Sequence, residues 1–86
     1  MTDKRDNAPS EIPLVLNDGI YKTSYPIPPD TIVEIQVEPD TGDGFAILDD
    51  GTEMEITKNL IELVTHHFPE VRITERFNFM RWLQRL

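Results

Sequence analysis

The sequence predicts a small α+β domain in which about five short strands come first and two C-terminal helices follow. Asp-Gly turns between short apolar runs predict β-hairpins. Alternation of apolar and polar residues predicts a half-buried strand, and apolar stripes at helical spacing occur only after residue 57. Because strands precede helices instead of alternating with them, α+β is favoured over α/β. We expect the strands to form a small antiparallel β-meander or an SH3-like barrel, with the helices on its open face.

Length and composition are those of one domain with a modest core, since the chain has 86 residues and 38% of them are hydrophobic. Residues 1–11 are polar and are predicted to be a disordered N-terminal tail, which leaves 12–86 as a single α+β domain. The chain has no cysteine, which excludes disulfides and thiolate metal sites. With no signal-like start and no long apolar run, we expect a cytoplasmic protein with no membrane partner.

The first hairpin is predicted by the turn at 17–19, which lies between the apolar runs 14–16 and 20–23. Asp-Gly suits such a turn because both of its central positions need a positive φ. The register stays open, because Asn17 can also belong to a three-residue loop. Three prolines within 25–30 then predict a stiff, extended connector.

A half-buried strand is predicted over 31–38 by its strict alternation. One face is expected to hold Thr31, Val33, Ile35 and Val37, and the other Ile32, Glu34, Gln36 and Glu38.

A second hairpin is predicted over 44–56 around Asp50-Gly51 as a two-residue type I′ turn. That register pairs Leu48 with Glu53. It puts Phe45, Ile47, Met54 and Ile56 on one face, and Ala46, Leu48, Glu53 and Glu55 on the other.

Two helices are predicted after this hairpin. Thr57 is the expected N-cap of a helix over about 58–67, which Pro69 ends. A short extended piece over 70–73 follows. Thr74 is the expected cap of a second helix that runs to the C-terminus, with an apolar arc that is wider than one buried face needs. That arc contains Phe77, Phe79, Met80, Trp82, Leu83 and Leu86.

The net charge of −8 is unevenly distributed. Residues 1–57 hold 13 acidic against 3 basic residues, whereas residues 58–86 hold 3 acidic against 5 basic ones. An acidic body disfavours direct binding to nucleic acid or to an anionic membrane, because both would repel it. It is compatible with a basic partner or with mimicry of the charge of a nucleic acid.

Catalytic and metal-binding patterns are weak. The Asp40–Gly44 turn has two carboxylates and lacks the distal glutamate of a calcium loop, and its residues are those that turns need. His66 and Glu70, four residues apart, are two ligands where zinc needs at least three. Neither Ser10 nor Ser24 has a nucleophile motif, so the sequence predicts no enzyme and no cofactor.

The predicted function is therefore a non-catalytic protein-binding module, either an accessory subunit or a small inhibitor, that binds another protein or a second copy of itself. Aromatic residues, Met and Arg are enriched at interfaces. The predicted contacts are an apolar and arginine-rich helix and an acidic sheet face: Phe77, Met80, Arg81, Trp82 and Arg85, with Glu34, Glu38, Glu53 and Glu55. The alternatives are an acidic nucleic-acid mimic that inhibits a DNA- or RNA-binding protein, and a small metal-binding protein or enzyme.

Overall fold

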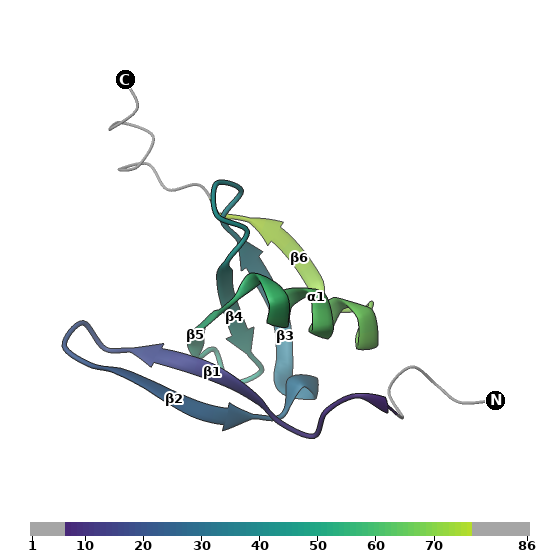
Figure 1. Ribbon diagram of the computed structural model, residues 1–86, viewed down its shortest axis with the longest axis horizontal. Helices are drawn as coiled ribbons and strands as arrows, with labels where there is room; N and C mark the ends of the chain where they lie inside the picture. The colour runs from purple at the N-terminus through teal and green to yellow at the C-terminus, as the bar shows by residue number, and fades with distance from the viewer. Residues whose placement is uncertain (1–6, 77–86) are drawn as a thin grey trace.

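The computed structural model describes residues 7–76, which form one six-stranded sheet with an α-helix packed on one face (Figure 1). The strand order is β2-β1-β5-β4-β3-β6, and every pair is antiparallel except β3 with β6. The elements are β1 (Ile12–Asn17), β2 (Lys22–Ile27), the 3-10 helix η2 (Pro29–Thr31), β3 (Ile32–Val37), β4 (Gly44–Leu48), β5 (Glu53–Ile56), α1 (Lys58–His67) and β6 (Arg72–Glu75).

The predicted α+β class is confirmed, and β3, β4 and β5 form an antiparallel meander. The sheet is open, however, so the SH3-like barrel is wrong: β2 and β6 end the sheet at opposite sides. The reason is the crossover through α1. It carries the chain from β5 across β4 and β3 to add β6 parallel to β3, instead of returning it to β2 (Figure 1).

The prediction of two C-terminal helices is also wrong for the part of the chain that is described, since α1 is the one α-helix in residues 7–76. Thr74, the expected cap of the second helix, lies in β6 opposite Gln36. The Arg76 N–H continues this ladder by donating to the Val37 carbonyl at 2.7 Å. The rest of that predicted helix, residues 77–86, lies outside the described residues.

The first hairpin pairs Asn17 with Lys22, so its loop has four residues (18–21). The Asp18 carboxylate closes the loop by accepting the backbone N–H groups of Ile20 at 2.9 Å and Tyr21 at 2.7 Å. Both hydrogen bonds hold the pKa of Asp18 below its ordinary value, the bond from Tyr21 having the larger effect. Gly19 supplies the positive φ, 93°, that the loop needs.

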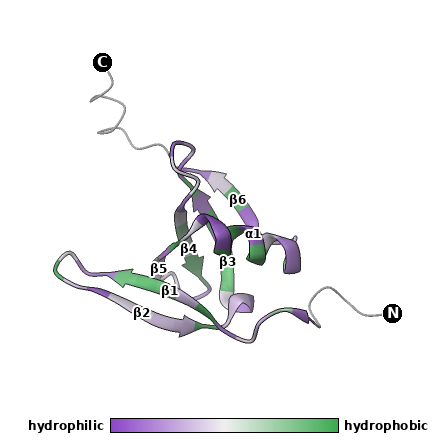
Figure 2. Ribbon diagram, in the orientation of Figure 1, coloured by the Kyte–Doolittle hydropathy of each residue, from purple (hydrophilic) through white to green (hydrophobic). Residues whose placement is uncertain are grey.

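The prolines of β1 and β2 lie opposite each other, Pro13 against Pro26. The Asp18 N–H donates to the Tyr21 carbonyl, and hydrogen-bonded pairs alternate along an antiparallel ladder. Pro13 and Pro26 therefore form a non-hydrogen-bonded pair, in which no donor is missed. Pro26 leaves one donor fewer on the free edge of β2, which disfavours the addition of another strand. Figure 2 shows the largely hydrophobic β1 beside the more hydrophilic β2.

The second hairpin differs by one residue from the predicted register: Ile47, not Leu48, lies opposite Glu53. The Gly51 N–H donates to the Leu48 carbonyl and Gly51 has φ 89°, so the loop has three residues, 49–51, and ends in a left-handed glycine. The slip exchanges the two faces of β4. The buried set is Ala46, Leu48, Met54 and Ile56, and the opposite set is Phe45, Ile47, Glu53 and Glu55.

Strand β3 does not alternate strictly, because it contains a β-bulge. Ile32 lies opposite Leu48 and Glu34 opposite Ile47, which leaves Val33 unpaired. The bulge allows Ile32 and Ile35 to face the core together, at 4% and 0% exposure. Val33, predicted to share the face of Ile35, is instead 50% exposed.

Helix α1 has the predicted bounds, and its stripe of Ile61 and Val64 is buried. Thr57 is its N-cap residue, as predicted, but makes no side-chain capping bond. That role falls to the Asp43 carboxylate in the β3–β4 loop, which accepts the Lys58 N–H at 2.8 Å. The helix closes one core with residues from β1, β3, β4 and β5: Ile12, Leu14, Ile32, Ile35, Ala46, Leu48, Met54, Ile56, Ile61, Val64 and Phe68. Within residues 7–76, no helix has the length and apolar character that crossing a membrane would require.

Candidate functional site

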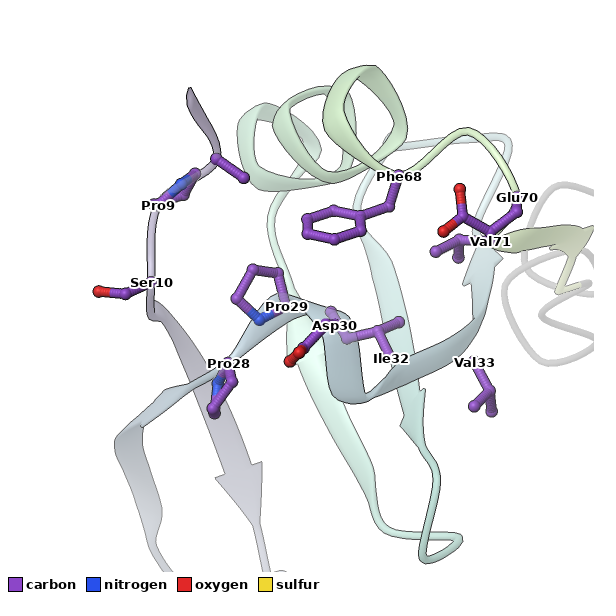
Figure 3. Close-up of a pocket in the computed structure, with 11 residues that line it drawn as sticks. Pro9, Ser10, Pro28, Pro29, Asp30, Ile32, Val33, Phe68, Glu70 and Val71 are labelled. Atoms are coloured by element: carbon purple, nitrogen blue, oxygen red, sulfur yellow. The ribbon is translucent and has the colours of Figure 1, made fainter. Parts of the chain in front are cut away.

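A groove with a volume of about 750 Å³ opens between the segment before β1, the η2 turn and the end of α1 (Figure 3). Its walls come from three stretches that are distant in the sequence, and most of its lining is apolar. The lining residues are Ala8, Pro9, Ser10, Pro28, Pro29, Asp30, Ile32, Val33, Phe68, Glu70 and Val71.

The walls of the groove are held by local hydrogen bonds. Both the N–H and the hydroxyl of Thr31 donate to the Pro28 carbonyl, at 3.1 and 2.7 Å, which fixes the η2 turn. On the opposite wall the Val71 N–H donates to the Phe68 carbonyl at 3.1 Å. Proline rings are rigid as well, so little entropy would be lost in ordering these two walls when a ligand binds.

The groove has an acidic character. Asp30 and Glu70 are exposed and belong to opposite walls (Figure 3). The residues that line it, all within the described part of the chain, include no Lys or Arg. An apolar floor with two carboxylates at its margin suits a ligand that combines apolar groups with positive charge.

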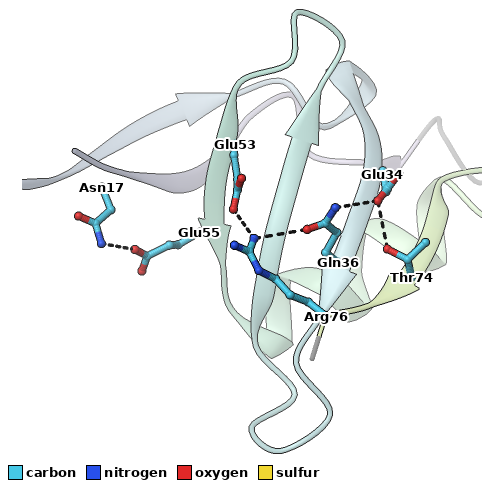
Figure 4. A network of polar contacts seen from close by, with 7 residues as sticks. All are labelled: Asn17, Glu34, Gln36, Glu53, Glu55, Thr74 and Arg76. Carbon is cyan, nitrogen blue, oxygen red and sulfur yellow. Dashed lines mark hydrogen bonds and ion pairs between the residues drawn. The ribbon is translucent and has the colours of Figure 1, made fainter. Parts of the chain in front are cut away.

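The second candidate is the sheet face opposite α1, called here the outer sheet face, where Glu34, Gln36, Glu53, Thr74 and Arg76 form one polar network (Figure 4). The Glu34 carboxylate accepts hydrogen bonds from the Gln36 amide at 3.0 Å and the Thr74 hydroxyl at 3.1 Å. Arg76 donates to the Gln36 side-chain oxygen at 3.3 Å and forms an ion pair with Glu53.

The other two predicted glutamates lie at the β1 side of this face and in the loop after β3. Glu55 accepts the Asn17 side-chain amide at 2.9 Å and pairs with the Lys22 ammonium at 3.4 Å. Glu38 and Glu55 both line a smaller hollow of about 400 Å³.

The pKa of Glu34 is held below its ordinary value, first by the hydrogen bond from Gln36, then by that from Thr74, with a smaller effect of the nearby Arg72 charge. Glu34 is therefore ionised at neutral pH and bound within its own sheet. No proton-transfer role follows from this arrangement, because a general acid or base needs a pKa close to the working pH.

The structure thus brings three of the four predicted glutamates, Glu34, Glu53 and Glu55, to one face, whereas Glu38 lies in the loop after β3, which ends at Val37. All three carboxylates are engaged, however: Glu53 pairs with Arg76 and Glu55 with Lys22, while Glu34 accepts hydrogen bonds from Gln36 and Thr74. The predicted contacts Phe77, Met80, Arg81, Trp82 and Arg85 lie outside the described residues.

The groove was not predictable from the sequence, where its only local signal is the pair Pro28-Pro29, part of the predicted connector over 25–30. Its other walls lie far away in the chain, at Pro9 and Phe68. Ala8, within the segment predicted to be a disordered tail, packs against the core.

The described residues contain no group of three His, Asp or Glu side chains that could hold a metal ion. His66 and His67 contact each other edge to face, with ring centroids 4.9 Å apart. Helix α1 ends at His67, so Glu70 does not continue the helical spacing from His66.

Fold and surfaces together define a small α+β module with an open mixed sheet, a groove with Asp30 and Glu70 at its margin, and an outer sheet face whose glutamates are engaged by neighbouring side chains. Comparisons with protein-family models, with curated proteins and with solved structures found no match.

Proposed function

We propose that the protein is a non-catalytic binding module whose groove holds a segment of another protein that carries apolar side chains flanked by Lys or Arg. The observation that carries this proposal is the groove itself: apolar walls from three segments, with Asp30 and Glu70 at the margin and no basic lining residue. A partner with this chemistry would bury apolar surface and place positive charge beside Asp30 at the margin of the groove.

The charge of the whole body supports a cationic partner. Residues 7–76 hold 14 acidic against 4 basic residues, a net charge of −10. Such a field raises the rate at which a positively charged segment encounters the groove and repels acidic competitors. The role of an accessory subunit or a small inhibitor, and a cytoplasmic location, belong to the same proposal.

The alternative of a nucleic-acid mimic has less support. A mimic needs free negative charges in a regular array, whereas Glu34, Glu53 and Glu55 are engaged by neighbours on the outer sheet face.

The test uses a fluorescein-labelled peptide in which leucine alternates with arginine, and a second peptide with glutamate in place of arginine. Binding to the full chain is measured by fluorescence anisotropy. The titration is repeated with an Arg81→Glu/Arg85→Glu chain, so that the positive charges of its own C-terminal segment do not compete. We expect binding of the arginine peptide alone, and weaker binding at high salt.

Two variants with the same net charge locate the binding site. Val33→Lys adds a cation within the groove at a residue that is 50% exposed, and Ile20→Lys adds one in the first hairpin loop at a residue that is 81% exposed. We expect Val33→Lys to weaken peptide binding about tenfold or more, as for the loss of a central contact, and Ile20→Lys to leave it nearly unchanged. The proposal would be refuted if the two variants bound the peptide equally well. It would also be refuted if neither the wild type nor the Arg81→Glu/Arg85→Glu chain bound the peptide.

A further inference from the structure

We propose that the chain's own residues 77–86 occupy the groove of the same molecule and thereby regulate its access to the partner. This inference rests on the proposed function, because it names the internal competitor for the same site.

The segment has the chemistry that the groove selects. Residues 77–86 contain Arg81 and Arg85 and no acidic residue, a charge of +2 against −10 for residues 7–76. Six of the ten residues are large and apolar, among them Trp82. Segment and groove are therefore complementary both in charge and in apolar character.

The start of the segment is held in place by three contacts of Arg76. Its N–H donates to the Val37 carbonyl at 2.7 Å, its guanidinium lies 4.0 Å from the centroid of the Phe45 ring, and it pairs with Glu53. The segment thus leaves the sheet at a defined position at the end of β6.

The groove is within reach of this position. Val71, which lines the groove, precedes Arg76 by five residues, and this length of extended chain spans about 17 Å. Ten further residues span up to about 33 Å, so the segment can return to the groove with residues to spare. A short tether gives an effective concentration in the millimolar range. Binding within one molecule is therefore favoured over binding to a second copy at micromolar protein.

The experiment uses the full chain and its single tryptophan, Trp82, as the probe. Acrylamide quenching of Trp82 fluorescence is measured in the wild type, Val33→Lys, Ile20→Lys and Arg81→Glu/Arg85→Glu chains. We expect Trp82 to be shielded in the wild type and in Ile20→Lys. We expect its quenching constant to rise about twofold or more in the other two, as an aromatic side chain leaves a pocket for water. Circular dichroism melting shows whether each variant is folded.

Dilution of the protein distinguishes binding of residues 77–86 within one molecule from their binding to a second copy. Shielding that is constant over a hundredfold dilution supports binding within one molecule. Shielding that is lost on dilution would assign Trp82 to a second copy and overturn the proposal, as would a Trp82 whose quenching ignores Val33→Lys.

The peptide titration distinguishes the two proposals. If the arginine peptide binds tighter to Arg81→Glu/Arg85→Glu than to the wild type, the segment regulates the groove. Equal peptide affinities together with an exposed Trp82 would leave the binding function intact and refute the regulation. If the shielding of Trp82 depends on Val33 but neither the wild type nor the Arg81→Glu/Arg85→Glu chain binds the peptide, the binding function alone is refuted.

Discussion

The guanidinium of Arg76 lies over the ring of Phe45, with its central carbon 4.0 Å from the ring centroid. The same side chain reaches Gln36 and Glu53, so it joins β6 to the outer sheet face of β3, β4 and β5 (Figure 4). β6 is the last strand of the sheet on this side, and its backbone pairs with β3 alone. Arg76 therefore attaches the end of β6 to β4 and β5, in addition to the ladder and the Thr74–Glu34 hydrogen bond that join β6 to β3.

The interaction of Arg76 with Phe45 can be measured by a double-mutant cycle with Arg76→Ala and Phe45→Leu in urea unfolding. We expect a coupling of about 0.5–1 kcal/mol, the usual range for a partly exposed cation–π pair. Lys22→Ala, which removes the exposed ion pair with Glu55, serves as the comparison. It should lower the free energy of unfolding by less than this coupling. A coupling of zero would mean that the stacking contributes nothing to stability.

Asp43 is the residue whose side chain caps α1, although Thr57 occupies the N-cap position. We expect Asp43→Ala to lower the free energy of unfolding by about 1 kcal/mol, the common effect of losing an N-cap acceptor. Thr57→Ala should have a smaller effect, because its hydroxyl makes no capping bond. Thermal melts of the two variants test this order, and the reverse order would contradict the structure.

Gly44 is required by a close approach of two strands. A Cβ at this position would lie 2.1 Å from the backbone carbonyl oxygen of Gln36, which cannot move without the strand. We expect Gly44→Ala to destabilise the fold by about 1–3 kcal/mol, as overpacking does, or to displace β4 from β3. Gly51→Asn is the comparison: its Cβ would meet open space, so only the positive φ of 89° opposes the side chain, and asparagine is among the residues that adopt positive φ most often. If alanine at 44 is harmless, the close approach is incorrect.

The lowered pKa of Glu34 predicts that the stability of the fold depends on pH. Its pKa is lower in the folded protein than its ordinary value of 4.5, chiefly because Gln36 and Thr74 donate hydrogen bonds to the carboxylate. A lowered pKa stabilises the fold at pH values above 4.5, and this contribution disappears as the pH falls through the folded pKa. Melting temperatures of wild type and Glu34→Gln should therefore converge as the pH falls from neutral to below 4.5. Glu62→Gln, on the exposed side of α1, gives the baseline for removing one carboxylate. A constant difference between wild type and Glu34→Gln would contradict the assignment.

The α+β class, the two hairpins and the bounds of α1 were predictable from the sequence, because they depend on neighbours along the chain. Asp-Gly pairs set the turns, Pro69 ends the helix, and the apolar spacing of Ile61 and Val64 selects its buried side. That Glu53 and Glu55 share a face follows from the period of two in a strand.

Other features needed contacts between distant residues. The loop at Asp50-Gly51 is compatible with two or three residues, and only packing of Ala46 and Leu48 under α1 decides between them. Thr74 has the composition of a helix cap, yet pairing with β3 makes it part of a strand. Tertiary context overrides local preference here, because β6 gains a whole ladder of hydrogen bonds.

What the chain determines locally is where each element begins and ends, since turns, caps and apolar periodicity act over a few residues. What only the tertiary structure decided is the open sheet, the bulge at Val33, the stacking of Arg76 on Phe45 and the groove between Pro9, Pro29 and Phe68. These features join segments that are far apart in the chain, and their energy comes from burial and pairing that no local pattern contains.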